Sequence, residues 1–254
     1  MKNLRYIAVA FFSIMAIDAM AWTTEVNKAV LMFAEENLSK RAKREVNILL
    51  GAPLSSVEFT GKGKSKTHLD ENGKSVTTDE KDAVVMLEKA IAMLKSGSAS
   101  TEERRAALRT AVEKTVDIHC LANILVEKHL EKDFTFSRHN SMQIGFRYYK
   151  VTKTSWQELW HKTFHKNHGV FSAEMYLYDW HIATKGMAKS YKKEAIEPRK
   201  WAEQSYERAL PALKILHTEE LLENVEVPKL EVINNASLYA AAFHLANLLN
   251  ETLK

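Results

Sequence analysis

The sequence predicts an all-α protein built as a single helical domain. Apolar residues recur at helical spacing over most of the chain, and the links between these segments are short. Capping residues and stop signals divide the pattern into about seven helices. One stretch, 134–152, is instead rich in aromatic and β-branched residues, so we expect a short hairpin or extended excursion there.

The N-terminus has the features of a secretory signal peptide over residues 1–21. Lys2 and Arg5 precede an apolar run, and Ala19-Met20-Ala21 matches an A-x-A cleavage site. The run is shorter than the roughly 20 apolar residues that a bilayer span needs. We therefore expect an exported protein, periplasmic or secreted. Its mature part should be one domain over residues 22–254 without a transmembrane segment.

Charge and cysteine content exclude some classes of protein. The formal net charge of +4 is too small to indicate nucleic-acid binding by itself. Cys120 is the only cysteine, so the fold has no internal disulfide and depends on its core. We interpret Cys120 as a small buried residue.

The first two helices and the loop after them have clear boundaries. One helix begins near Glu25, and a second runs from Ser39 to Gly51, where glycine is a typical stop signal. Residues 52–78 have the composition of a loop.

A third helix is expected from an N-cap at Thr78 to about Lys95. Ser100 and Glu103 then form a capping box, in which serine and glutamate each bind a free backbone N–H. This box starts the central helix, which we expect over residues 101–128.

Further signals place helices in the second half of the chain. A capping box at Ser155 predicts a helix to about 167, and Ser172 starts one that ends near Gly186. Pro198 suits the first turn of another helix, in which Pro211 should force a kink or a break. The last helix is expected over residues 232–253.

Three aromatic residues in the helix that follows Ser172 could be read as a base-stacking platform. We interpret them as core residues, because residues two positions apart on a helix point in different directions. They are Tyr176, Tyr178 and Trp180.

The central helix carries a candidate metal-binding motif. Residues 111–123 read AVEKTVDIHCLAN and bring Asp117 close to His119. This segment resembles the H-x-x-G-D-I-H-Q-P-L-H helix of zinc-dependent single-strand nucleases, a family with the phospholipase C/nuclease fold. The D-I-H of that pattern is unchanged at 117–119.

Two further regions carry the same resemblance. Cleavage after Ala21 would make Trp22 the first mature residue, and the family also begins its mature chain with Trp. The family ends in A-G-x-R-L-A-x-x-L-N, of which this chain keeps Ala241, Leu245, Ala246, Leu249 and Asn250. The chain is similar to a divergent, bacterial-type member of the family.

The resemblance implies a site for three zinc ions that orient water against a phosphodiester. Trp22 would bind metal through its free amine and its backbone carbonyl, and Asp117 and His68 are the other ligands that remain. Asp117 would be catalytic if the protein is active. Six ligand positions carry a different residue here: Asn27, Lys62, Glu113, Asn123, Gln157 and His161.

These replacements reduce the metal that we expect. Only Glu113 and His161 among them can still bind zinc, and closely spaced divalent cations repel one another unless carboxylates offset them. We therefore expect no zinc ion or a single one, and not three.

A second metal-binding face is open to interpretation. His161, His165 and His168 fall on one helical face, and imidazoles at i and i+4 can chelate a transition metal. Lys162 and Lys166 lie between them, which favours the alternative of a solvated polar face.

Asp117 should itself be buried, because its neighbours on the helix are largely apolar. A buried carboxylate needs a partner. The candidates are Lys62, His68, His119 and the amides of Asn27 and Asn123.

The favoured hypothesis is an exported nuclease-like protein with a degenerate zinc site, catalytically impaired or inactive, that acts as a binding or structural relative. The alternative is an active endonuclease or phosphodiesterase that hydrolyses single-stranded nucleic acid with a reduced metal site. A third hypothesis is an unrelated helical protein. The resemblance suggests a single-stranded nucleic acid or a nucleotide as the partner, and the sequence identifies no other.

Overall fold

The computed structural model describes ten segments of the chain, and within them the protein is a mostly helical single domain with seven α-helices. The expected signal peptide, and most of the helix expected after Ser155, lie outside these segments. The described segments are 22–56, 66–125, 134–143, 146–154, 156, 159–160, 172–183, 194–218, 221–222 and 226–254.

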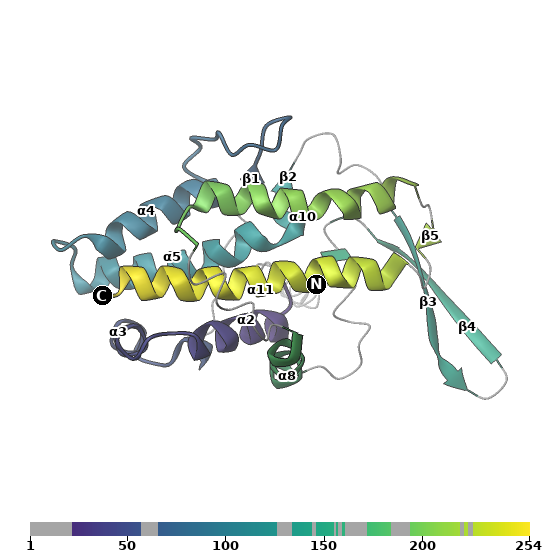
Figure 1. The fold of residues 1–254 in the computed structure, drawn as a ribbon, viewed down its shortest axis with the longest axis horizontal. Coiled ribbons are helices and arrows are strands. Elements are labelled where there is room, and N and C mark those ends of the chain that lie inside the picture. Colours follow the sequence, from purple (N-terminus) through teal and green to yellow (C-terminus); the bar gives the residue numbers. More distant parts are fainter. Residues whose placement is uncertain are drawn as a thin grey trace, which may run out of the picture.

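The seven helices pack around the longest of them. Figure 1 shows α11 along the middle of the molecule, and it contacts α2, α5 and α10. Helix α4 packs along α5, and α8 packs on α2. The helices are α2 (Thr24–Glu36), α3 (Lys40–Leu50), α4 (Ala83–Lys95), α5 (Thr101–His119), α8 (Ala173–Ala183), α10 (Pro198–Thr218) and α11 (Glu226–Thr252).

Several helix boundaries follow the predicted signals. Ser39 accepts a hydrogen bond from the backbone of α3, and Gly51 ends that helix in the left-handed conformation, with φ 75°. The capping box of Ser100 and Glu103 starts α5 as expected. Ser172 also accepts a bond from the first turn of α8. These local predictions are confirmed.

The predicted start of α4 is wrong. The N-cap is Asp82 and not Thr78, and the Asp82 carboxylate accepts the backbone N–H of Val84 at 2.8 Å. The same buried carboxylate also accepts the backbone N–H of His68 at 2.8 Å. The helix begins at Asp82 because there one side chain bonds two chain segments.

The predicted end of the central helix is also wrong. Helix α5 ends at His119, where Cys120 leaves the helical conformation. The chain continues into the short helix η2 (Leu121–Asn123) and strand β2 (Ile124–Leu125), which pairs in parallel with β1 (Thr67–His68). Pairing with β1 takes the backbone out of the helix nine residues before the expected end at 128.

Pro211 affects α10 less than predicted, and α11 is longer than predicted. Helix α10 continues through Pro211 without a break. Pro211 and Glu207 are exposed, so water can bind the carbonyl that loses its helical partner. Helix α11 starts at Glu226, earlier than the expected 232. Pro228 is its third residue, where a backbone N–H has no intrahelical partner.

A β-hairpin occupies the predicted excursion and projects from one end of the helices (Figure 1). Strands β3 (Phe134–Gln143) and β4 (Phe146–Thr154) are antiparallel, with Phe134 opposite Thr154. Strand β5 (Leu221–Leu222) pairs in parallel with β3. One further short helix, η1, covers Leu54–Ser56.

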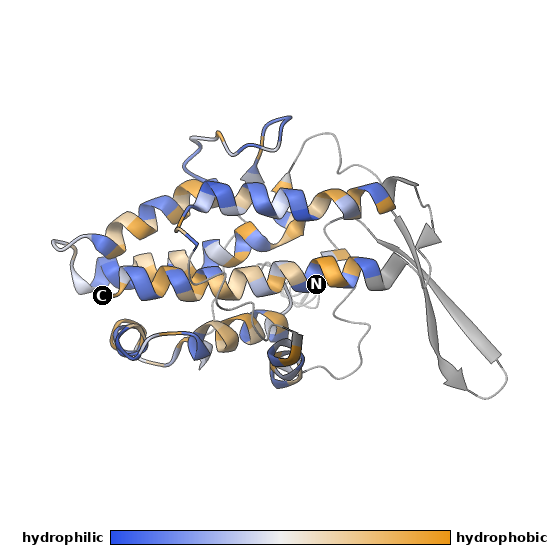
Figure 2. Ribbon diagram, in the orientation of Figure 1, coloured by the Kyte–Doolittle hydropathy of each residue, from blue (hydrophilic) through white to orange (hydrophobic). Residues whose placement is uncertain are grey.

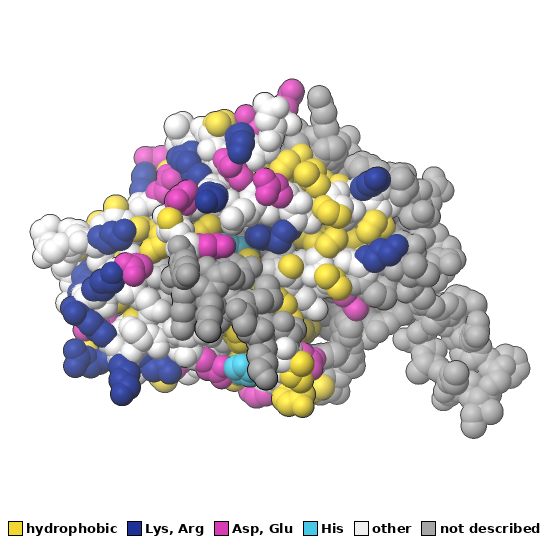
Figure 3. All heavy atoms as spheres, in the orientation of Figure 1, with side chains coloured by type: hydrophobic (Ala, Val, Ile, Leu, Met, Phe, Trp, Pro, Cys, Tyr) yellow, Lys and Arg dark blue, Asp and Glu magenta, His cyan; other side chains and the backbone are white. Residues whose placement is uncertain are grey.

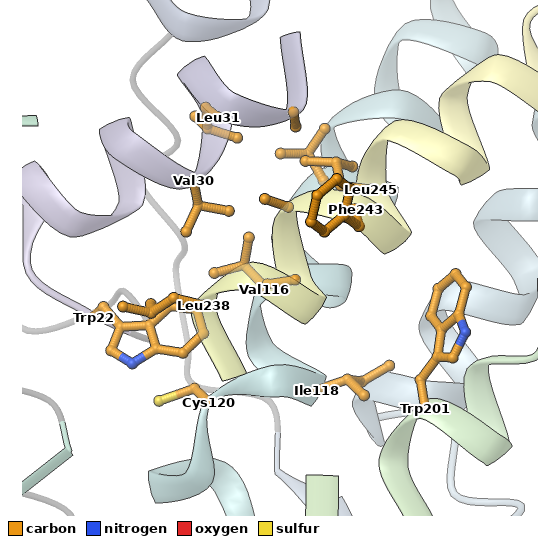
Figure 4. Close-up of a cluster of buried hydrophobic side chains, with 14 of the residues drawn as sticks. Trp22, Val30, Leu31, Val116, Ile118, Cys120, Trp201, Leu238, Phe243 and Leu245 are labelled. Carbon is orange, nitrogen blue, oxygen red and sulfur yellow. The ribbon is translucent and has the colours of Figure 1, made fainter. Parts of the chain in front are cut away.

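The core lies between α2, α5, α10 and α11. Figure 2 shows hydrophilic and hydrophobic residues alternating along the helices, as expected for helices with one buried face. Side chains from all four helices meet in Figure 4, among them Val30, Ile118, Trp201 and Phe243. No described helix has the length and apolar character that a membrane span requires.

The prediction that the aromatic residues of α8 belong to the core is confirmed for Tyr176 and Trp180 and wrong for Tyr178. Tyr176 and Trp180 are buried, whereas the Tyr178 side chain points outward and is 68% exposed. Trp180 contacts Phe33 and Tyr239 edge-on, at centroid distances of 5.9 and 5.4 Å. These rings therefore pack α8 onto α2 and α11.

Replacing Ser100 by alanine should lower the free energy of unfolding by about 1 kcal/mol, because Ser100 satisfies the N–H of Glu103 at the start of α5. Urea denaturation measures the change. Ser98→Ala is the control, since Ser98 is exposed and its hydroxyl contacts only the hydroxyl of Ser96 among the described hydrogen bonds. Equal stability of the two variants would contradict the role of the cap.

Candidate functional site

Asp117 is buried as predicted, and its main partner is one that sequence reasoning missed. Asp117 belongs to α5, and its side chain is buried in the core of the protein. Lys114 Nζ is 2.8 Å from Asp117 Oδ2. Lys114 is itself only 4% exposed. The sequence contained a signal for this pair, because residues at i and i+3 lie on the same face of a helix. A buried ammonium thus offsets the charge of the carboxylate.

Asn123 is the predicted partner that does contact Asp117. Its amide Nδ2 donates to the backbone carbonyl of Asp117 at 3.2 Å and lies 3.5 Å from Asp117 Oδ1. The three other described candidates have different partners: Asn27 bonds Trp22, His68 bonds Asp82, and His119 bonds Thr115 and His244. Lys62 lies outside the described residues.

Trp22 and Asn27 form the second pair among the predicted positions. Asn27 Nδ2 donates to the backbone carbonyl of Trp22 at 2.7 Å, and both residues are buried. The Trp22 indole lies in the hydrophobic core close to Cys120 and Val116 (Figure 4). The buried Trp22 Nε1 and Asn27 Oδ1 have no hydrogen-bond partner within the described part of the chain.

His68 and Glu113 lie at the edge of the core. His68 Nδ1 is 3.1 Å from Asp82 Oδ2, and half of the His68 side chain is exposed. Its strand partner is Leu125, which places His68 near the end of the segment that contains Asn123. Glu113 is half-buried, and this burial raises the pKa of its carboxyl against the opposing effect of Lys114 and Arg109.

The remaining predicted site residues lie outside the described segments, so the metal content stays a prediction. Where side chains are described, no three His, Cys, Asp or Glu residues are grouped closely enough to hold a metal ion. The positions outside are Lys62, Gln157, His161, His165 and His168.

A buried chain of polar side chains, which sequence reasoning missed, crosses the core. His119 Nδ1 is 2.7 Å from the carbonyl of Thr115, and His119 Nε2 is 2.7 Å from His244 Nδ1. His244 Nε2 is in turn 2.7 Å from Glu194 Oε2. Trp201 stacks on the His244 ring at 4.5 Å with an interplanar angle of 7°. The chain therefore links α5, α11 and the segment before α10.

Burial controls the protonation of the two imidazoles. Removal from water lowers the pKa of His244 to about 4, helped by the charge of Arg208 and opposed by Glu194. The pKa of His119 lies well below its usual value, mainly because the ring is fully buried and secondarily because of His244 and Arg208. Burial therefore favours the neutral form of both rings. The sequence signal for this buried network was the position of His119 and His244, each within a largely apolar helical segment.

The chain ends at a cavity of about 730 Å³ between the ends of α2 and α11 and the segment before α10. Glu194 lines this cavity, and its side chain is 37% exposed. The lining is mostly polar. It comprises Glu36, Asn37, Leu38, Ser39, Lys95, Glu194, Ala195, Ile196, Asn247, Asn250 and Glu251.

Positive charge gathers at one end of the molecule. Figure 3 shows lysine and arginine side chains at the end that carries α3 and the C-terminus. Helix α3 lies at this end (Figure 1), and its start, KRAKR over residues 40–44, contains four lysine and arginine residues. They lie at the positive end of the helix dipole, where they do not stabilise α3.

No protein-family model matches the sequence, and a search of curated proteins finds no match to it. The resemblance to zinc-dependent nucleases therefore depends on the motifs quoted above.

Replacing Lys114 by methionine should lower the free energy of unfolding by about 3–5 kcal/mol, because it leaves the buried Asp117 carboxylate without its cation. Lys28→Met is the control. Lys28 pairs with Glu174 at 3.4 Å with both side chains largely exposed, and its loss should cost less than about 1 kcal/mol. Chemical denaturation compares the two, and similar losses would contradict a buried ion pair.

The low pKa of His244 predicts acid sensitivity. The unfolded chain takes up a proton near pH 6.5, whereas folded His244 does so only near pH 4. The unfolded state therefore binds more protons in this window, and stability falls as the pH falls from 6.5 to 4. The loss should be about 3 kcal/mol. Titrating the free energy of unfolding of wild type and His244→Gln should show this loss of about 3 kcal/mol in wild type only, above the loss that both proteins share from carboxylates and from His119.

Proposed function

We propose that this protein is an exported, nuclease-like protein with a degenerate zinc site, and that it acts as a binding or structural protein without hydrolytic activity. The observation that carries the proposal is the buried ion pair of Lys114 and Asp117, at 2.8 Å. Asp117 is the carboxylate that the resemblance assigns to the metals.

Charge explains why this pair disfavours a zinc cluster. A metal at Asp117 would lie a few ångströms from the Lys114 ammonium, and like charges at that distance in a low-dielectric core repel strongly. Lys114 is buried and cannot turn its charge to water without leaving the core. In this arrangement the ammonium provides the positive charge that zinc provides in the family.

The contact of Asn27 with Trp22 supports the same proposal. The resemblance assigns a metal to the Trp22 carbonyl, which here accepts the Asn27 amide at 2.7 Å. Asn27 itself stands where the family has a histidine ligand, and an amide is a poor ligand for zinc. The residues present thus do not fit a trinuclear site, and we derive no catalytic step through zinc.

One observation favours the alternative of a hydrolase with a reduced metal site. His68 Nδ1 contacts the buried Asp82 carboxylate, and a carboxylate in this position orients zinc-bound histidines in many proteins. The His68 side chain is half exposed, so its other ring nitrogen can be reached from solvent. His68 would then be the residue on which any single metal depends.

Metal analysis of the protein that starts at Trp22 separates the two functions. After dialysis against zinc we expect no zinc, or one weakly held ion, and no hydrolysis of single-stranded DNA or RNA, because the Asp117 carboxylate and the Trp22 carbonyl already bond nitrogen donors. His68→Ala is the matched variant. Hydrolysis in wild type that is lost in His68→Ala would support the alternative, and two or three tightly bound zinc ions would contradict the degenerate site.

A further inference from the structure

The start of α3 carries charges that its own helix disfavours. The first turn contains no acidic residue, and the N-terminus of a helix is the positive end of its dipole, so cations there lower the stability of the helix. In the part of the chain that the structure describes, the four cations make no ion pair and no side-chain hydrogen bond, not even with Glu45, the one carboxylate of α3. The four are Lys40, Arg41, Lys43 and Arg44.

The outward face of α3 combines these cations with an exposed aliphatic side chain. Lys40, Arg41 and Arg44 are exposed, and Ile48 lies one turn after Arg44 with 58% of its surface exposed. Residues at i and i+4 share a helix face, so Arg44 and Ile48 lie on the same side of the helix as Lys40. The opposite side packs on the core through Ala42, Val46 and Leu49.

The elements beside α3 leave its charge uncompensated. Helix α3 contacts α5 and α11, and Figure 3 shows further lysine and arginine side chains at this end of the molecule. The cations of these neighbours are paired within their own helices, since Arg105 contacts Glu102 and Lys254 contacts Glu251. The acids of the neighbouring helix ends are therefore engaged, and the cations of α3 remain available to an external anion.

We propose that the outward face of α3 docks on an anionic phospholipid bilayer. Lys40, Arg41 and Arg44 would contact the phosphates of the lipid headgroups, and Ile48 would insert between them. Each lysine or arginine near an anionic bilayer raises the affinity by about fivefold, and an inserted aliphatic side chain adds a hydrophobic contribution. The cost that these cations impose on the helix is then offset when the protein binds.

The composition of this face favours a bilayer over other anionic partners. Proteins that bind single-stranded nucleic acid without sequence preference stack bases on aromatic side chains, and α3 contains no aromatic residue. A second copy of the same face would bring like charges together. The face contributes none of the residues of the degenerate zinc site, so the test of one proposal does not decide the other.

Cosedimentation with vesicles tests the proposal on the protein that starts at Trp22. Vesicles of phosphatidylcholine and phosphatidylglycerol should bind the protein at least tenfold more tightly than vesicles of phosphatidylcholine alone, and added salt should weaken this binding. The variant Lys40→Gln/Arg41→Gln/Arg44→Gln should bind the anionic vesicles at least tenfold more weakly than wild type.

Two matched controls separate this face from the rest of the surface. Lys81→Gln/Lys89→Gln/Lys229→Gln changes the net charge equally at exposed lysines outside α3, and its affinity should stay within about twofold of wild type, because salt screens charges far from the bilayer. Ile48→Ser should weaken binding by about threefold or more. Val232→Ser, at an exposed residue of α11, should leave it unchanged.

The triple variant of α3 should keep its fold, with a thermal unfolding temperature at or above that of wild type, because it removes cations from the positive end of the helix dipole. If it fails to fold, the two vesicle types and Ile48→Ser decide. The proposal is overturned by equal binding to both vesicle types, by equal losses in the two triple variants, by no binding at millimolar lipid and low salt, or by tighter binding of single-stranded DNA than of vesicles through the same three cations.

Discussion

The contact between His119 and His244 is the interaction on which the arrangement of the core depends. A buried imidazole that lacks a hydrogen-bond partner is costly, so α5 and α11 must keep the spacing and rotation that hold these two nitrogens 2.7 Å apart. Trp201 extends the constraint to α10 by stacking on His244. Apolar packing alone tolerates small shifts between helices, whereas a hydrogen bond between rings in the core does not.

The same constraint explains the unusual composition of α5. Its second half places Lys114, Thr115, Asp117 and His119 in the core, and each has a hydrogen-bond partner there. Most of these bonds stay within the helix or reach the turn after it, so they stabilise the C-terminal part of α5. The polar groups of this segment are therefore largely satisfied internally. His119 is the exception, because its Nε2 contacts His244. His244 in turn contacts Glu194, which lines the cavity.

Helix boundaries could be predicted where the signal was local. Ser39, Gly51 and Ser100 act within a few residues of their own position, so their effect can be read from the chain alone. The predictions failed where a distant segment decided the boundary. Asp82 replaced Thr78 as a cap because it also bonds His68, and α5 stopped at His119 where the chain turns to pair with β1.

The sequence by itself determined a mostly helical domain, the burial of Asp117 and Cys120, and the start and end of the helices that have their own caps. Periodicity and capping are short-range effects, so a single chain contains the information for them. Only the tertiary structure decided which buried polar groups meet. His119 and His244 are 125 residues apart, and Glu194 is 50 residues from His244. No spacing rule connects such positions, because their distance depends on how three helices pack.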